Sequence, residues 1–193
     1  MIDSTGLKVV GAGEWLHEKH DGKPSRSWRK LHLAVDRDNG EILASKLTTT
    51  DDGDASLVGP LLDQIDCPIA SMTADGAYDG EPIYRSVAAH TPDAAVIIPP
   101  RSTAVPSDTA EIAPTPRDRH IEMIGERGRL GWQRAVNYGK RSLAEVAMFR
   151  YKKLVGRGLH ARTLPTQKTE AKVACKIINI MTGLGMPVSR RVV

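Results

Sequence analysis

Four side chains that can carry or bind charge recur at helical spacing late in the chain: Tyr138, Arg141, Glu145 and Lys152. At about 100° per residue, one helix would gather all four in a stripe roughly 60° wide. Glu145 is the one acid among six Lys and Arg between residues 138 and 157. Such a carboxylate is either an ordinary ion-pair partner on a solvated face or a ligand for a metal ion. The cations beside it would suit phosphate groups.

Two aspartates have sequence contexts that match each other. Asp3 follows the apolar Ile2, and Asp75 ends the run Met72-Thr73-Ala74 and precedes Gly76. We expect each aspartate to emerge from a strand at or near the carboxyl edge of a sheet, where α/β folds usually place their sites. Taken singly, either aspartate is more often a turn or helix-cap residue. Spacing alone does not bring the three acids together.

The elements that must position these acids indicate a mixed α/β sheet with helices packed on it. Apolar and polar residues alternate on both sides of the turn Asp38-Asn39-Gly40, which predicts a β-hairpin over 28–49. The apolar start of the chain predicts a further strand or a pair of strand pieces. The other expected elements are helices at 54–65, 81–90 and 167–182, strands at 71–74 and 94–98, and a largely helical stretch at 118–157. Five prolines within 99–116 predict a loop or linker there.

Length and composition describe one globular domain with a hydrophobic core: 193 residues, 40% hydrophobic and 26% charged. A net charge of +4 favours a polyanionic partner such as nucleic acid without establishing one. Cys67 and Cys175 have no paired metal spacing, which favours a reducing, cytoplasmic compartment. No apolar run approaches the roughly 20 residues that a membrane crossing needs.

The spacing Tyr-x2-Arg-x3-Glu-x6-Lys resembles the signature of bacterial insertion-sequence transposases of the three-carboxylate (DDE) class. Tyr138, Arg141, Glu145 and Lys152 match it without a gap. The neighbouring segments are similar to family five of the insertion sequences: Ile2-Asp3-Ser4-Thr5, 27–36 (SWRKLHLAVD), 74–79 (ADGAYD), Arg141-Ser142-Leu143 and 149–152 (FRYK). The similarity runs through most of residues 2–157, and several separated motifs in the right order are more specific than any one of them.

The resemblance implies an RNase H-like fold, a mixed five-stranded sheet flanked by helices. The first aspartate then lies on the first strand, the second just after the fourth, and the glutamate on a later helix. Residues 1–160 would form the catalytic domain, with the proline-rich linker 99–116 inside it, and residues 161–193 a C-terminal helix and tail.

The resemblance also implies the chemistry. Asp3, Asp75 and Glu145 would bind two Mg²⁺ or Mn²⁺ ions, with Asp3 shared, for cleavage and strand transfer at the ends of an element. Arg141 and Lys152 would contact DNA phosphates, supported by Tyr138. Arg141 is also spaced for an i,i+4 ion pair with Glu145, which makes its role less specific. The expected partner is DNA, bound by a homo-oligomer.

Two alternatives stay open. One is a nuclease of the same fold that never joins strands, against which the ungapped Tyr/Arg/Glu/Lys spacing argues. The other is an inactive fragment that only binds DNA. Relatives of this family usually carry an upstream helical segment that recognises element ends. We therefore expect an N-terminally truncated copy or a second reading frame, with little activity of its own.

Overall fold

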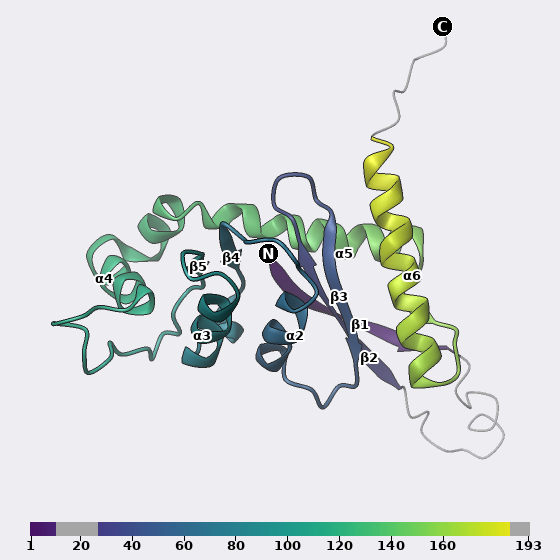
Figure 1. The fold of residues 1–193 in the computed structure, drawn as a ribbon, viewed down its shortest axis with the longest axis horizontal. Helices are drawn as coiled ribbons and strands as arrows, with labels where there is room; N and C mark the ends of the chain where they lie inside the picture. Colours follow the sequence, from purple (N-terminus) through teal and green to yellow (C-terminus); the bar gives the residue numbers. More distant parts are fainter. Residues whose placement is uncertain (11–26, 186–193) are drawn as a thin grey trace, which may run out of the picture.

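The computed structural model describes residues 1–10 and 27–185 and has a mixed α/β architecture (Figure 1). The described strands are β1 (Ile2–Val9), β2 (Trp28–Val35), β3 (Ile42–Thr48), β4 (Ser71–Thr73), β5 (Ala95–Ile97) and β6 (Gly158–Leu159). The α-helices are α2 (Val58–Leu62), α3 (Glu81–His90), α4 (Pro116–Ala135), α5 (Ser142–Leu154) and α6 (Leu164–Gly183). Three short 3-10 helices complete the fold: η1 (Asp54–Leu57), η2 (Gly76–Tyr78) and η3 (Tyr138–Arg141). Within these ranges no helix is long and apolar enough to cross a membrane.

The main sheet has the strand order β3-β2-β1-β6. The predicted hairpin is confirmed: β2 and β3 pair antiparallel, and Gly40 in their turn has φ 74°, a conformation that glycine adopts at no steric cost. The apolar start forms one strand, β1, which pairs antiparallel with β2. Asp3 is the second residue of β1, so the expectation that it lies near the carboxyl end of a strand is wrong for Asp3.

A single five-stranded sheet is not what the structure contains. β4 and β5 pair with each other, in parallel, as a separate two-stranded sheet. Each has only three residues, so the pair offers few ladder bonds for a further strand. β6 instead extends the main sheet, parallel to β1 at Lys8 and Val9. A two-residue strand has no hydrophobic period, which is why the sequence did not predict β6.

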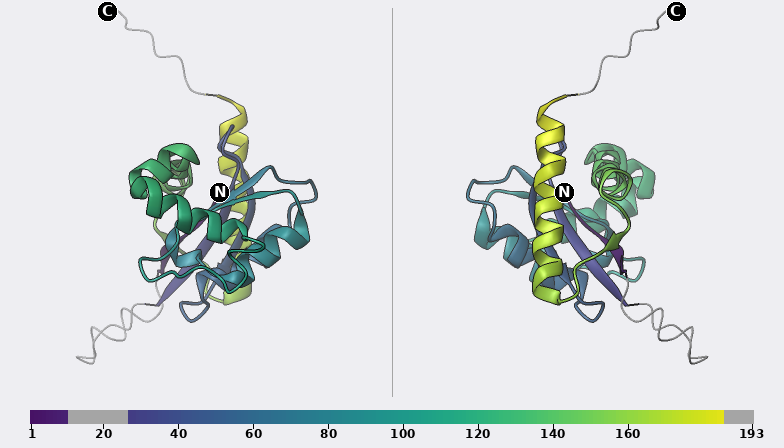
Figure 2. Two further views of the ribbon diagram at one scale, coloured as in Figure 1. Left: turned by 90° about the vertical axis from the view of Figure 1, so that its left-hand side faces the viewer. Right: turned by 90° about the vertical axis from the view of Figure 1, so that its right-hand side faces the viewer.

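Helices cover both faces of the main sheet, and the alternation of side chains assigns each residue to a face. Leu31, Leu33 and Val35 of β2 pack in a core with α5 and α6. Ala34, together with Ile2 of β1, packs in a second core with α2, α3 and β4. Figure 2 shows the sheet between these two layers of helices. Asp3 pairs with Leu33 in the β1–β2 ladder, so its side chain belongs to the face that α5 covers.

The stretch predicted at 118–157 is helical but interrupted at Val136 and Asn137, and the predicted helix from Tyr138 to Lys152 begins with a 3-10 turn, η3, that runs directly into α5. α4 ends at Ala135, and Asn137 adopts a left-handed conformation with φ 55°. Tyr138 and Arg141 lie on η3, whereas Glu145 and Lys152 lie on α5. Asparagine tolerates the left-handed region better than most residues, and it stops helix propagation there.

The proline-rich segment between β5 and α4 contains neither helix nor strand, as expected of a loop, and is attached to α4 by Asp118. The Asp118 carboxylate accepts hydrogen bonds from the Ser107 amide at 2.7 Å and from the Ser107 hydroxyl at 2.8 Å. It also accepts from the amide and hydroxyl of Thr115, the N-cap of α4. Asp118 is 4% exposed. These bonds, led by that from the Ser107 amide, hold the pKa of Asp118 well below its ordinary value.

Replacing this carboxylate should destabilise the protein in a pH-dependent way. We expect Asp118→Asn to lower the free energy of unfolding by about 1–3 kcal/mol, because hydrogen bonds to a buried charge are lost. A depressed pKa means that the stabilisation is complete above the unfolded-state value of about 4 and is lost as the pH falls toward the folded-state value. Urea denaturation should therefore show a constant gap between wild type and variant above about pH 5 that narrows below about pH 4. A gap that grows on acidification would contradict this assignment.

Candidate active site

The three acids singled out by the sequence come from three different elements. Asp3 lies on β1, with its side chain on the α5 face of the sheet. Asp75 follows β4 and caps η2, where its Oδ1 accepts a hydrogen bond from the Ala77 amide at 2.8 Å. Glu145 is in the first turn of α5 and is exposed. Their positions on a strand, just after a strand and on a later helix match the order that the resemblance implies.

Arg141 connects two of these acids. Its Nη1 lies 3.3 Å from Oδ2 of Asp3, and its Nη2 lies 2.6 Å from Oε1 of Glu145. The second contact is the i,i+4 pair that the spacing allowed, but the first joins residues 138 positions apart in the sequence. The guanidinium therefore forms a bridge between β1 and the start of α5.

The third acid shares the electrostatic environment of the other two. Burial of the carboxyl group raises the pKa of Asp3. The Ser4 amide and the Arg141 guanidinium lower it, whereas the negative charges of Asp75 and Glu145 raise it further. Asp3 is thus a partly buried carboxylate that is repelled by the charges of Asp75 and Glu145 and contacts the Arg141 guanidinium.

The carboxylates do not yet form one coordination set. Among residues 1–10 and 27–185, no group of three acid, histidine or cysteine side chains is placed so that it could hold a metal ion. The structure therefore brings Asp3 and Glu145 together through Arg141, and Asp75 within electrostatic range of Asp3. All three residues have the oxygen ligands that hard divalent cations prefer.

The remaining residues of the predicted stripe have different surroundings. The Tyr138 hydroxyl donates to the carbonyl of Ala74, the residue before Asp75, at 3.4 Å. Its ring packs on Trp132, with 5.2 Å between centroids, and burial raises the pKa of its hydroxyl. Lys152 is half-buried on α5, seven residues beyond Glu145. Tyr138 therefore links η3 to the strand end that carries Asp75, a contact that the sequence did not predict.

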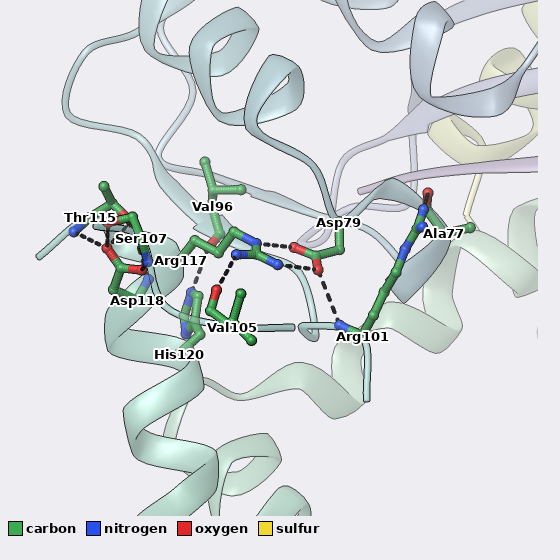
Figure 3. A network of polar contacts seen from close by, with 10 residues as sticks. All are labelled: Ala77, Asp79, Val96, Arg101, Val105, Ser107, Thr115, Arg117, Asp118 and His120. Carbon is green, nitrogen blue, oxygen red and sulfur yellow. Dashed lines mark hydrogen bonds and ion pairs between the residues drawn. The ribbon is translucent and has the colours of Figure 1, made fainter. Parts of the chain in front are cut away.

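Sequence reasoning also missed the role of Asp79, four residues after Asp75 and within the segment that carried the resemblance. Figure 3 shows its carboxylate between two arginines. Arg117 donates to it from Nε at 2.8 Å and from Nη2 at 3.1 Å, and the Arg101 amide donates at 3.1 Å. Burial alone would raise the pKa of Asp79, but the Arg117 and Arg101 contacts hold it below its ordinary value. The sequence shows a second aspartate directly after Tyr78 and arginines at 101 and 117. It contains no local pattern that pairs these arginines with Asp79.

A comparison with known protein families identifies the family of this chain. A family model described as the transposase DDE domain matches residues 1–180 of the chain. No solved structure matches the chain significantly. The matched range includes β1, η2 and α5, and so all three acids. The chain therefore belongs to the family of transposases with a DDE domain.

Proposed function

We propose that this chain is the catalytic domain of an insertion-sequence transposase that cuts DNA at element ends and joins them to a target. Membership of the DDE family implies DNA transposition and phosphoryl transfer on DNA in general. The finer assignment, to family five and to strand transfer in an RNase H-like fold, depends on the sequence motifs. The single structural observation that carries the catalytic assignment is the Arg141 guanidinium, held between Asp3 and Glu145 at 3.3 and 2.6 Å.

The donor set fits the divalent metal ions that this family generally uses. The acids supply only carboxylate oxygens, which suit Mg²⁺ or Mn²⁺. Arg141 already puts a positive charge between two of them, in the place where a cation would balance the same acids. Asp3 would be the ligand shared by the ions, and Asp75 and Glu145 would each complete one of two sites. When bound, such ions would activate a water or a DNA 3′-hydroxyl and stabilise the leaving oxygen.

The other side chains of the site, Arg141, Lys152 and Tyr138, would position the DNA for the reaction. Arg141 would hold a DNA phosphate, for which its planar guanidinium is suited, when metal ions balance the charges of Asp3 and Glu145. Lys152, on the same helix as Glu145, is assigned to a second phosphate. Tyr138 fixes η3 against Ala74 and thereby sets the distance between Arg141 and Asp75. We expect more than one copy to assemble on the DNA.

Strand joining separates this proposal from the two alternatives. The purified chain is incubated with Mg²⁺ or Mn²⁺, a short duplex that ends in a free 3′-hydroxyl, and supercoiled plasmid as target. We expect covalent joining of the duplex to the plasmid at a low rate, dependent on the metal ion and abolished by EDTA. Nicked plasmid without joined product would favour a nuclease, and DNA binding without either product would favour a non-catalytic fragment. Both results would contradict the proposal.

A further inference from the structure

The 3-10 helix η2 has an aspartate at each end. Asp75, before it, accepts a hydrogen bond from the Ala77 amide and is half-buried. Asp79, after it, donates its own amide to the Gly76 carbonyl at 3.2 Å and turns its carboxylate away from solvent, with 1% of the side chain exposed. A turn of three residues is too short to keep its direction unless its ends are fixed. The contacts of Asp79 therefore matter for where Asp75 points.

Asp79 is fixed from two directions. Arg117, in the first turn of α4, grips both of its oxygens and uses its third nitrogen to donate to the Val105 carbonyl at 3.1 Å. The Arg101 amide donates to Asp79, and the Arg101 guanidinium reaches back to the Ala77 carbonyl at 3.4 Å (Figure 3). A two-point grip by a planar guanidinium restricts both the position and the orientation of a carboxylate.

η2 is also packed too closely against the chain after β5 to shift in that direction. A Cβ added at Gly76 would lie 3.2 Å from the Pro99 carbonyl oxygen. Glycine at this position lets the turn approach the backbone that leads to Arg101.

The helix that holds Asp79 is attached to the other side of Asp75 as well. His120 of α4 contacts the Val96 carbonyl of β5 through Nε2 at 2.8 Å, and its Nδ1 accepts from Trp132 at 2.8 Å. Since Nδ1 is the acceptor, Nε2 must carry the proton and donate to Val96. Trp132 packs on Tyr138, which donates to the Ala74 carbonyl. α4 is kinked at Gly128, and its two halves meet the Asp75 segment from the C-terminal side through Arg117 and Asp79 and from the N-terminal side through Trp132, Tyr138 and Ala74.

We propose that Asp79 and Arg117 are a positioning pair, which sets the direction of the Asp75 carboxylate by fixing η2 to the start of α4. In this role the pair acts through Asp75 and not directly on DNA or metal. This inference rests on the proposed function, in which Asp75 binds a metal ion. The inference predicts that breaking the Asp79–Arg117 pair weakens metal binding even though Asp3, Asp75 and Glu145 are unchanged.

The test compares Asp79→Asn and Arg117→Lys with Asp118→Asn as matched control. Asp118 anchors the same proline-rich segment to the same end of α4 through four hydrogen bonds, but it has no contact with η2. Arg117→Lys keeps the positive charge and loses the two-point grip, so it remains informative if Asp79→Asn folds poorly. Two quantities are measured on the full chain: the Kd for Mn²⁺ by electron paramagnetic resonance, and the exchange rate of the Ala77 amide by NMR.

We expect both pair variants to weaken Mn²⁺ binding by about tenfold, the lower end of what outer-shell partners of metal ligands contribute. The Ala77 amide should exchange faster in both, because its bond to Asp75 reports the direction of that carboxylate. Asp118→Asn should leave both quantities within about twofold of the wild type even though it lowers stability.

Two results would overturn the inference: wild-type Mn²⁺ affinity and Ala77 exchange in Asp79→Asn, or equal effects in all three variants, which would indicate general loosening. A wild type that binds no Mn²⁺, or binding that Asp75→Asn leaves unchanged, would instead count against the proposed function. The exchange rate of Ala77 would still decide whether the pair holds the turn.

Discussion

Asp75→Asn will reduce Mg²⁺-dependent cleavage and joining by on the order of 10³-fold while leaving the fold intact. Asparagine has the shape of aspartate and keeps an oxygen that can accept the Ala77 amide, so the η2 cap survives. What it lacks is the negative charge and the second carboxylate oxygen that a hard cation requires. Because the side chain is half-buried and makes no ion pair that the structure records, we expect the free energy of unfolding to change by less than about 1 kcal/mol.

The measurement is a plasmid nicking and joining assay, with the melting temperature recorded for each variant. Asp3→Asn and Glu145→Gln should lose activity to a similar extent, since residues that act as one unit are not additive. Asp93→Asn is the matched control, because Asp93 is an exposed aspartate in the turn before β5. If Asp75→Asn retained more than about a tenth of the wild-type rate, Asp75 would not be a ligand for the reaction.

The parts of the fold that could be predicted are those with a strong local signal. The hairpin followed from alternation around an Asn-Gly turn, and α3 was predicted with its observed bounds, Glu81–His90. Asp75 was placed just after a strand because an apolar run ends there. These features depend on residues close together in the sequence, which is where pattern and propensity are informative.

The features of the fold that the sequence did not predict depend mostly on contacts between residues far apart in the chain. β6 has two residues and pairs with β1 where Gly158 lies so close to the chain after β1 that a Cβ would be 2.5 Å from a Val10 methyl group. The break between α4 and η3 depends on the backbone of a single asparagine, Asn137. β4 and β5 form a sheet of their own, and the pattern of apolar residues in either strand does not indicate to which sheet the strand belongs.

The candidate site divides in the same way. The residue types, their contexts and their spacing singled out Asp3, Asp75, Glu145 and Arg141, and the resemblance added the expectation that the three acids converge. The i,i+4 pair between Arg141 and Glu145 could be foreseen, but its extension to Asp3 could not, because it needs β1 and α5 to meet. The partner of Asp79 lies 38 residues away, beyond the reach of any local pattern.

Arg141→Ala should have opposite effects on the two ligands of the site. The guanidinium neutralises Asp3 and Glu145 and so competes with any cation for the same oxygens. A partly exposed ion pair is worth about 1 kcal/mol, so its removal should tighten Mn²⁺ binding by about fivefold. DNA binding should weaken, and the slope of log affinity against log salt should fall by about 0.9, the loss of one phosphate contact.

The control for this prediction is Arg85→Ala. Arg85 is an arginine on α3 that forms an i,i+4 pair with Glu81, so it matches the helical pair of Arg141 without its bridge to β1. It should change neither Mn²⁺ affinity nor the salt slope. The sign of the Mn²⁺ effect is what distinguishes two roles for Arg141. Tighter binding means that the guanidinium holds the place of the cation until the metal ion and DNA displace it. Weaker binding would mean that Arg141 instead holds the acids in the geometry that the metal ion needs, and that it stays between them during the reaction.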